Sequence, residues 1–246
     1  MPHGGLVKLP SGIEIPATKM AAFTSLYEDE SKTFFVMALP DIWRPIYGKE
    51  PGQAEFFQGV IVHELTHTRQ LVAVQRRVTE VLLEHQAGDM DLDDDIVQNH
   101  FADVPGFRVA FERELDLFFR AAAEPEANRQ RALAARALAM VRQRRQRYFT
   151  GRNRMYAELE DLFLSMEGAG QWAAYQLARA RTGSHTVFDA PLVELVRSNR
   201  KFWSQEEGLA MFLLLDAMTT AWQARVFAPK PAVPVTLLNE AVKTRR

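Results

Sequence analysis

The pattern of apolar and polar positions divides the chain into a short β-rich beginning and a long helical remainder. Residues 1–32 hold no long periodic run and are interrupted by prolines and glycines, so we expect irregular or weakly β structure there. The segment Thr33–Leu39 (TFFVMAL) is β-branched and aromatic at its start and is followed by Pro40, which predicts a strand. Residues 41–52 carry two prolines and two glycines and predict a loop.

Apolar residues recur at intervals of three and four from Gln53 onward, and this is the period of a helix with one apolar face. The pattern continues to about Glu84 through a series of apolar positions: Phe57, Val60, Ile61, Leu65, Leu71, Val74, Val78 and Val81. We therefore predict one helix over residues 53–84.

Further helical patterns follow an acidic loop at residues 88–95. They cover residues 107–123, 126–149, 154–181, 205–224 and 235–243, with a proline-rich connector at 227–234. No internal repeat interrupts this order. We predict a mainly α fold with a small N-terminal β element, an α+β arrangement in a single domain over residues 1–246, with a β/loop part at 1–52 and a helical part at 53–246.

Composition narrows the classes of function. The formal net charge of −1 gives no global attraction to nucleic acid or to an anionic membrane. An arginine-rich stretch at residues 129–154 is interleaved with apolar residues, so we interpret it as a solvated helix face or as partners for buried carboxylates, not as a nucleic-acid site. Neither a membrane-spanning apolar run nor a signal-peptide pattern is present. We expect a soluble protein, either cytoplasmic or exported with its signal peptide absent from this chain.

The chain has no cysteine, so any metal must be held by histidine, aspartate or glutamate. The segment VIVHELTHTRQ contains the HExxH pattern, formed by His63, Glu64 and His67. Residues four apart share one helix face, so both imidazoles can reach one cation. Glu64 lies roughly 100° around the helix, where it can take a proton from a water that the metal polarises. Zinc held in this way needs a third protein ligand and an open position.

The HELTH segment resembles the active-site helix of zincin metallopeptidases, and the resemblance covers residues 33–85. It implies Zn2+ as the cofactor, a peptide or protein as the substrate, His63 and His67 as ligands and Glu64 as the catalytic base. No third histidine follows in the metzincin spacing, and Gln86 stands where aminopeptidase-type spacing would place a glutamate. The segment is also similar to the gluzincin class, and this resemblance implies that the third ligand is a glutamate on a later helix.

Two Glu-Gly pairs, Glu167-Gly168 and Glu207-Gly208, are similar to the motif around a gluzincin third ligand. The segment Ser204–Glu207 has the pattern of a capping box, which gives Glu207 a structural role at a helix start. Glu167 lies inside a helical pattern among small residues that permit close helix approach, and a lone buried carboxylate needs a positive partner. We predict Glu167 as the third ligand, with Glu207, Glu112 and Glu114 as the alternatives.

Weaker signals suggest how a substrate is bound. The strand at residues 33–39 precedes the zinc helix and is a candidate edge strand for binding an extended peptide, although an ordinary core strand fits it equally. Tyr156, Tyr175 and His185 are candidates for stabilising an oxyanion.

The sequence thus favours a zinc-dependent metallopeptidase of the gluzincin-like type. The alternative is a zincin-like metal-binding module without protease activity, and a third interpretation is a helical interaction protein in which the motif arose by chance. The intact Glu64 favours the enzyme over the inactive module. The sequence leaves the oligomeric state open.

Overall fold

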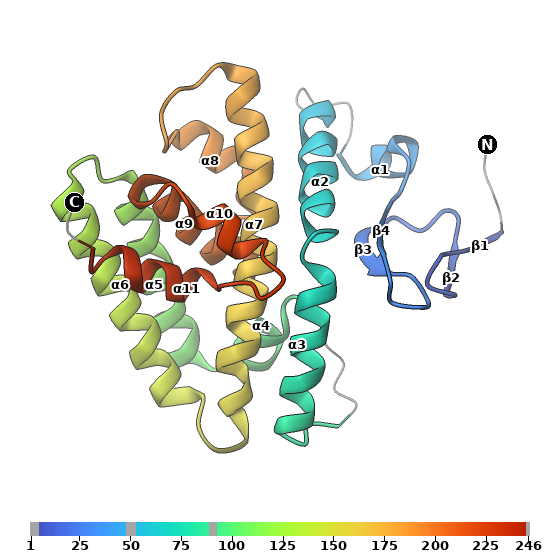
Figure 1. Cartoon of the computed structure of the whole chain (residues 1–246). Coiled ribbons are helices and arrows are strands. Elements are labelled where there is room, and N and C mark those ends of the chain that lie inside the picture. Colours follow the sequence, from blue (N-terminus) through green and yellow to red (C-terminus); the bar gives the residue numbers. More distant parts are fainter. Residues whose placement is uncertain (1–4, 48–52, 89–92, 245–246) are drawn as a thin grey trace.

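Two small antiparallel sheets near the N-terminus precede a body of helices (Figure 1). The computed structural model describes residues 5–47, 53–88 and 93–244. In this part the chain is mainly α with a small N-terminal β element, as the sequence predicts. The assignment of residues 1–246 to a single domain stays a prediction.

Each sheet is a single pair of strands. The first pairs β1 (Leu6–Lys8) with β2 (Glu14–Pro16). The second pairs β3 (Ala22–Leu26) with β4 (Thr33–Met37) in a register that places Thr24 opposite Phe35. The strand predicted at 33–39 is thus present as β4. Its partner β3 lies in the segment expected to be irregular or weakly β, because five residues of mixed character give little periodic signal.

Helix α1 (Pro40–Tyr47) occupies most of the segment predicted as a loop, so that prediction is wrong for residues 41–47, and residues 48–52 lie outside the described part. Pro40 stands in the first turn of the helix, where its missing N–H is not needed. Trp43 holds this helix in place: its indole N–H donates to the Ala38 carbonyl at 3.0 Å, and its ring meets the ring of Phe57 edge-on.

The helix predicted over residues 53–84 is divided into α2 (Gln53–His67) and α3 (Leu71–Glu84), which follow one another along one line in Figure 1. At the division, the amides of Arg69 and Gln70 bond to carbonyls only three residues earlier. The hydroxyl of Thr68 donates to the Leu65 carbonyl at 2.7 Å. Such local bonds compete with the helical ladder. The prediction of a single helix is therefore wrong here, and His67 becomes the last residue of α2.

Helix α7 (Tyr156–Thr182) lies at the centre of the helical body, between α2 and α3 on one side and α9 (Trp203–Met218) on the other (Figure 1). Gly168 of α7 and Gly208 of α9 meet where the two helices cross. A Cβ built on either glycine would lie 2.5 Å from the backbone of the other helix. The close approach of α7 and α9 thus requires glycine at both positions.

The remaining helices cover the outer sides of α7 and α9. Four helices begin and end within two residues of the predicted bounds: α5 (Pro105–Ala123), α6 (Ala127–Tyr148), α7 and α11 (Pro234–Ala241). Two short helices, α4 (Ile96–Phe101) and α8 (Ala190–Val196), were not predicted, because two turns or fewer show no clear period. Every helix in the described ranges is too short or too polar to cross a membrane.

The helix predicted at 205–224 ends at Met218, and a separate α10 (Trp222–Val226) follows. The backbone is extended at Thr219, which ends α9. This break lets Trp222 fold back so that its indole N–H donates to one carboxylate oxygen of Asp216 at 2.8 Å. The indole N–H of Trp172 donates to the other oxygen at 2.6 Å. A partly buried polar contact between helices thus outweighs the continuous apolar pattern.

A cluster of charged side chains lies inside the body, between α5, α6, α7 and α9. The Arg144 guanidinium is fully buried and donates to Glu114 at 2.5 Å and to Glu160 at 2.7 Å. Arg145 donates to Glu160 and Asp161, each at 2.7 Å. Two residues of the arginine-rich stretch therefore serve as partners for buried carboxylates, one of the two roles expected for it.

Glu207 joins this cluster with its nearest oxygen 3.9 Å from Arg144, and neither of its oxygens has a hydrogen-bond partner among the described residues. Burial, and then the negative charge of Glu114, raise the pKa of Glu207 well above its ordinary value. Burial and the charge of Glu160 likewise raise the pKa of Glu114 to about 7. Two arginines face more than two carboxyl groups, so we infer that Glu207 keeps its proton in the folded protein.

We predict that Glu207→Gln makes the protein more stable at pH 8 and changes its stability little at pH 5. With a raised folded-state pKa, the stabilising contribution of a carboxyl group is present below its ordinary value of 4.5 and is lost as the pH rises through the raised value. Glutamine has no proton to lose. The melting temperature at pH 8 should rise by a few degrees, since about 1 kcal/mol shifts it by roughly 2–4 °C at this chain length.

Glu160→Gln is the matched control. Burial opposes its charge, but Arg144 and Arg145 hold the pKa of Glu160 below its ordinary value, so its stabilising contribution is present above that value. Glu160→Gln should therefore lower the melting temperature at pH 8. An equal loss of stability in Glu207→Gln at pH 8 would mean that Glu207 is ionised in the folded protein.

Candidate metal centre

Helix α2 and helix α7 bring three buried metal-ligating side chains together: His63, His67 and Glu167. The Nε2 atoms of the two imidazoles lie 2.8 Å apart. One oxygen of Glu167 is 3.2 Å from His63 Nε2, and the other is 3.1 Å from His67 Nε2. The structure thus places Glu167 beside both histidines of the HExxH pattern, in a group that could hold a metal ion.

The spacing of these atoms fits a small cation. A tetrahedral zinc ion about 2.1 Å from each nitrogen or oxygen ligand keeps those atoms about 3.4 Å apart. The observed separations of 2.8 to 3.2 Å are slightly shorter, so small outward shifts would admit the ion. Glu167 Oε1 is buried and lies 3.1 Å from His67 Nε2, with no other hydrogen-bond partner among the described residues.

The charge of the Glu167 carboxylate also favours a cation between His63, His67 and Glu167. Burial alone would raise the pKa of the Glu167 carboxyl, but His67 and His63 hold it below its ordinary value. Burial would lower the pKa of His67, yet the charge and the hydrogen bond of Glu167, together with the charges of Glu64 and Asp94, raise it. The carboxylate is therefore ionised and requires a cation beside it, which a proton on His67 or a metal ion would supply.

Two buried glutamates of α7, Glu160 and Glu167, have different charged partners. Glu160 lies seven residues, or about two turns, before Glu167, and its charge is compensated by Arg144 and Arg145. In the described part of the chain, Glu167 has only the two histidines as ion-pair partners. The donor set of two imidazoles and one carboxylate fits a divalent metal ion that accepts nitrogen and oxygen ligands.

Gln171 orients one of the imidazoles. Its side-chain N–H donates to the Val196 carbonyl at the end of α8, so its Oε1 must be the atom that lies 3.0 Å from His63 Nδ1. An acceptor at this place keeps the ring proton on Nδ1 and leaves Nε2 free to bind a metal. No motif or spacing in the sequence marks this role, because Gln171 reaches His63 only through the packing of α7 on α2.

Gly170 leaves the space that the His63 ring fills. A Cβ built on Gly170 would lie 2.7 Å from His63 Nδ1. The small residues after Glu167 were expected to allow a close approach to the helix that carries the HExxH pattern. Gly170 serves this purpose, whereas Gly168 allows the approach of α9 instead.

Glu64 is buried and stands apart from the three-residue group, held by strand β3. The Thr24 hydroxyl lies 2.8 Å from Glu64 Oε2 and 2.9 Å from the Glu64 carbonyl oxygen. The sequence pointed to β4 as the strand beside the site, but β4 contacts the end of α2, where Thr33 donates to the Thr68 carbonyl at 2.8 Å. Binding of a peptide along the edge of β4 stays a prediction.

The alternative third ligands are engaged elsewhere. Glu114 and Glu207 lie in the buried cluster around Arg144, and Glu112 lies 3.9 Å from Arg200. The predicted capping box at Ser204–Glu207 is wrong, because α9 begins at Trp203 and its N-cap makes no side-chain hydrogen bond. Glu207 has a structural place in the core, not at a helix start.

The three candidates for stabilising an oxyanion lie away from the site. The Tyr175 hydroxyl donates to the Val187 carbonyl and accepts from the Asp189 amide. Tyr156 stacks on His100, and His185 is exposed after the end of α7. None of the three lines the cavity beside His63. The polar side chains that do line it next to His63 include Gln171 and Gln205, and Gln205 donates to Glu167 at 3.2 Å.

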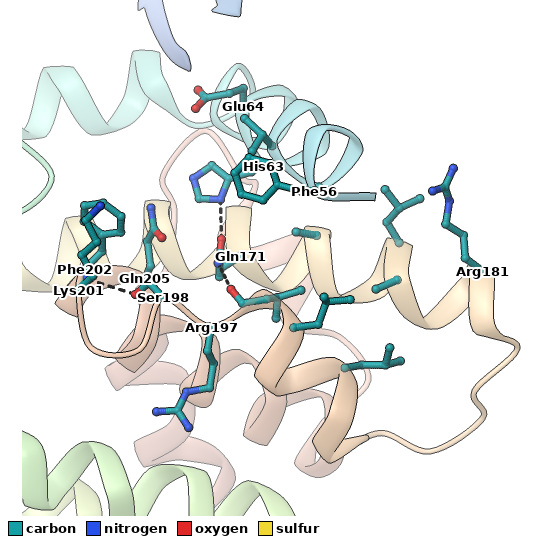
Figure 2. Close-up of a pocket in the computed structure, with 18 of the residues that line it drawn as sticks. Phe56, His63, Glu64, Gln171, Arg181, Arg197, Ser198, Lys201, Phe202 and Gln205 are labelled. Atoms are coloured by element: carbon teal, nitrogen blue, oxygen red, sulfur yellow. Dashed lines mark hydrogen bonds between the residues drawn. The ribbon is translucent and has the colours of Figure 1, made fainter. Parts of the chain in front are cut away.

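A cavity of about 430 Å³ opens beside His63 and Glu64. Its walls come from α2, the second half of α7, α8 and the loop that leads into α9 (Figure 2). Its volume lies in the range of small-molecule binding sites. The candidate metal group, the carboxylate of Glu64 and a space for a substrate are therefore contiguous.

We predict that Gly170→Ala weakens metal binding. The added methyl group would push the His63 ring away from Gln171 and Glu167, and loss of such an orienting contact costs about 10–100-fold in metal affinity. Competition for Zn2+ with a coloured chelator measures this change. Circular dichroism checks that the variant is folded.

Gly59→Ala is the control at the same interface of α2 with α7. A Cβ on Gly59 would make an ordinary contact at 3.7 Å with Ala174, so its Zn2+ affinity should match that of the parent protein. Unchanged affinity in Gly170→Ala would show that the His63 ring does not depend on this space.

Comparisons with models of protein families, with curated proteins and with solved structures found no match. A function for this chain is therefore inferred from the residues of the site and their geometry.

Proposed function

We propose that this chain is a zinc-dependent metallopeptidase of the gluzincin-like type. His63, His67 and Glu167 would hold the metal, and Glu64 would act as the general base. The observation that carries the proposal is the position of Glu167: a helix far along the chain delivers its carboxylate to the two imidazoles of an HExxH pattern, beside an open cavity.

Zinc is the metal that the two imidazoles and the carboxylate favour, together with the neighbouring Glu64. Two imidazoles and one carboxylate leave a tetrahedral position open, as in catalytic zinc sites. The same donors also suit non-haem iron, but a carboxylate directly after the first histidine serves hydrolysis, which needs a base. When bound, zinc supplies Lewis acidity that makes a water more acidic and a substrate carbonyl more electrophilic.

Glu64 would accept and then donate the proton that is transferred in the reaction. The Thr24 hydroxyl donates to Oε2 of Glu64, and Glu64 is one of the residues that line the cavity. In hydrolysis, the oxygen of water attacks the peptide carbonyl carbon, and Glu64 accepts the proton that this water loses. As the carbon–nitrogen bond breaks, Glu64 returns the proton to the departing amine, so that one water is consumed for each bond cleaved.

The surrounding residues would keep these groups in position. Gln171 holds the His63 ring through Nδ1, and Gln205 supports the Glu167 carboxylate from the side of α9. Burial of the three ligands keeps bulk water from competing for them. A metal-binding module without protease activity would need neither an oriented base nor an adjoining cavity, so these features favour the enzyme.

The first expected outcome concerns metal content. Protein purified without chelators should hold close to one zinc per chain by elemental analysis. His63→Ala, His67→Ala and Glu167→Ala should each lose it, because two remaining ligands bind zinc weakly.

Glu112→Ala should retain zinc, since Glu112 lies near Arg200 and away from the group. Wild-type protein that remains free of zinc even when the metal is added would disprove the proposal. Full zinc occupancy in Glu167→Ala would remove that residue from the ligand set.

The second expected outcome concerns Glu64. Glu64→Gln should retain its zinc, because this side chain is not a ligand, and should cleave a fluorescence-quenched peptide library at least about 100-fold more slowly, which is the usual contribution of a general base. Thr24→Val should have a smaller effect, because it removes only the hydrogen bond that orients the base. Wild-type activity in Glu64→Gln would exclude Glu64 from the mechanism.

A further inference from the structure

The cavity beside the metal centre has an uneven distribution of polar and apolar side chains. Near His63 it is bordered by polar groups, whereas farther along α7 its walls are aliphatic: Ala174, Leu177, Ala178, Leu192, Leu195 and Val196. Phe56 on α2 and Leu195 on α8 are apolar residues of the lining with exposures of 41% and 61%. An apolar occupant would cover both, which is favourable because it removes apolar surface from water.

Arg181 closes the far end of this apolar stretch. It lines the cavity from the last turn of α7, and Figure 2 shows it on the side of His63 opposite to Lys201 and Gln205. In the described residues, no carboxylate forms an ion pair with Arg181. Arg197, another basic residue of the cavity lining, directly follows α8 and forms ion pairs with Glu194 and Glu206. Arg181 is thus an exposed guanidinium without an ion-pair partner among the described residues, at the end of an apolar groove.

The length of the groove sets the size of its occupant. Gln171, which contacts His63, and Arg181 are ten residues apart on one helix, or about 15 Å along its axis. An extended peptide rises about 3.3 Å per residue, so four or five residues would span this distance. A guanidinium group matches a carboxylate through two parallel hydrogen bonds.

We propose that this groove binds the C-terminal end of an apolar peptide, with the terminal carboxylate on Arg181 and four or five residues between it and the bond at the metal centre. The proposal rests on the proposed peptidase function and gives it a substrate class: peptides with a free, apolar C-terminal tail. Lys201 lies on the other side of His63 (Figure 2) and does not bind this carboxylate.

Binding to the zinc-loaded Glu64→Gln protein tests the groove without cleavage. The probe is a fluorescein-labelled peptide that ends in five alternating leucine and alanine residues, with a free carboxylate or with a C-terminal amide. Fluorescence anisotropy should show that the free acid binds about 10-fold more tightly than the amide. A tail in which serine replaces leucine should bind more weakly in both forms.

Variants in the Glu64→Gln background assign the carboxylate to its partner. Arg181→Gln should remove the preference for the free acid. Arg179→Gln is the matched control, because Arg179 lies in the same last turn, carries the same charge and is not part of the cavity lining. It should retain the full preference. Equal binding of acid and amide, or an equal loss of preference in Arg179→Gln, would overturn the proposal.

Cleavage of the same peptides by the wild-type protein distinguishes a failure of the groove proposal from a failure of the peptidase proposal. If the free acid binds preferentially but the wild-type, zinc-loaded protein cleaves no peptide, the groove is correct and the peptidase function is wrong. If the protein cleaves unrelated peptides and ignores both the apolar tail and its carboxylate, the function is correct and the groove is wrong.

Discussion

The carboxylate of Glu167 lies inside the protein with its charge intact, and much of the structure around it serves to compensate that charge. An ionised carboxylate away from water is costly unless a cation lies beside it. The helical body supplies arginines to Glu160 on the same helix, whereas it offers Glu167 two imidazoles. Histidine nitrogens in this arrangement are ligands for a metal ion as well as partners for a carboxylate, and this dual character makes the group a candidate metal centre.

The packing of α7 explains how the group is assembled. Gly170 gives the His63 ring its place, and Gly168 lets α9 cross at backbone contact. One short segment of helix therefore fixes Glu167 between two neighbours, α2 and α9. The cost of glycine in a helix interior is roughly 0.5–1 kcal/mol per residue relative to alanine, and the dense packing that follows offsets this cost.

The buried cluster around Arg144 shows a second solution to the same problem. Its carboxyl groups outnumber the arginines, and the excess is relieved by raised pKa values at Glu114 and Glu207. Near the candidate metal centre, Glu167 has a lowered pKa instead. The difference in ionisation follows from the partners of each carboxylate, since burial opposes the charge in both places.

The sequence by itself determined the features that depend on local pattern. The period of apolar residues located α5, α6, α7 and α11 closely, and the run at residues 33–39 located β4. The spacing of His63 and His67 is fixed by one turn of helix, so their proximity followed from the HExxH letters alone. The choice of Glu167 over Glu207 also came from the sequence, although the capping box invoked against Glu207 is absent from the structure.

The tertiary structure alone decided the features that join distant segments. Thr24 reaches Glu64 across forty residues, and Gln171 reaches His63 from a different helix; neither residue type nor spacing marks such contacts in advance. The division of the expected helix between His67 and Leu71 coincides with backbone hydrogen bonds to carbonyls three residues earlier and with the hydrogen bond of the Thr68 hydroxyl to the Leu65 carbonyl, which compete with the helical ladder. The cavity arises where α2, α7 and α8 fail to fill the space between them, and such a shape depends on how whole helices pack. Local periodicity reports which face of a helix is buried, but it carries no information on which partner covers that face.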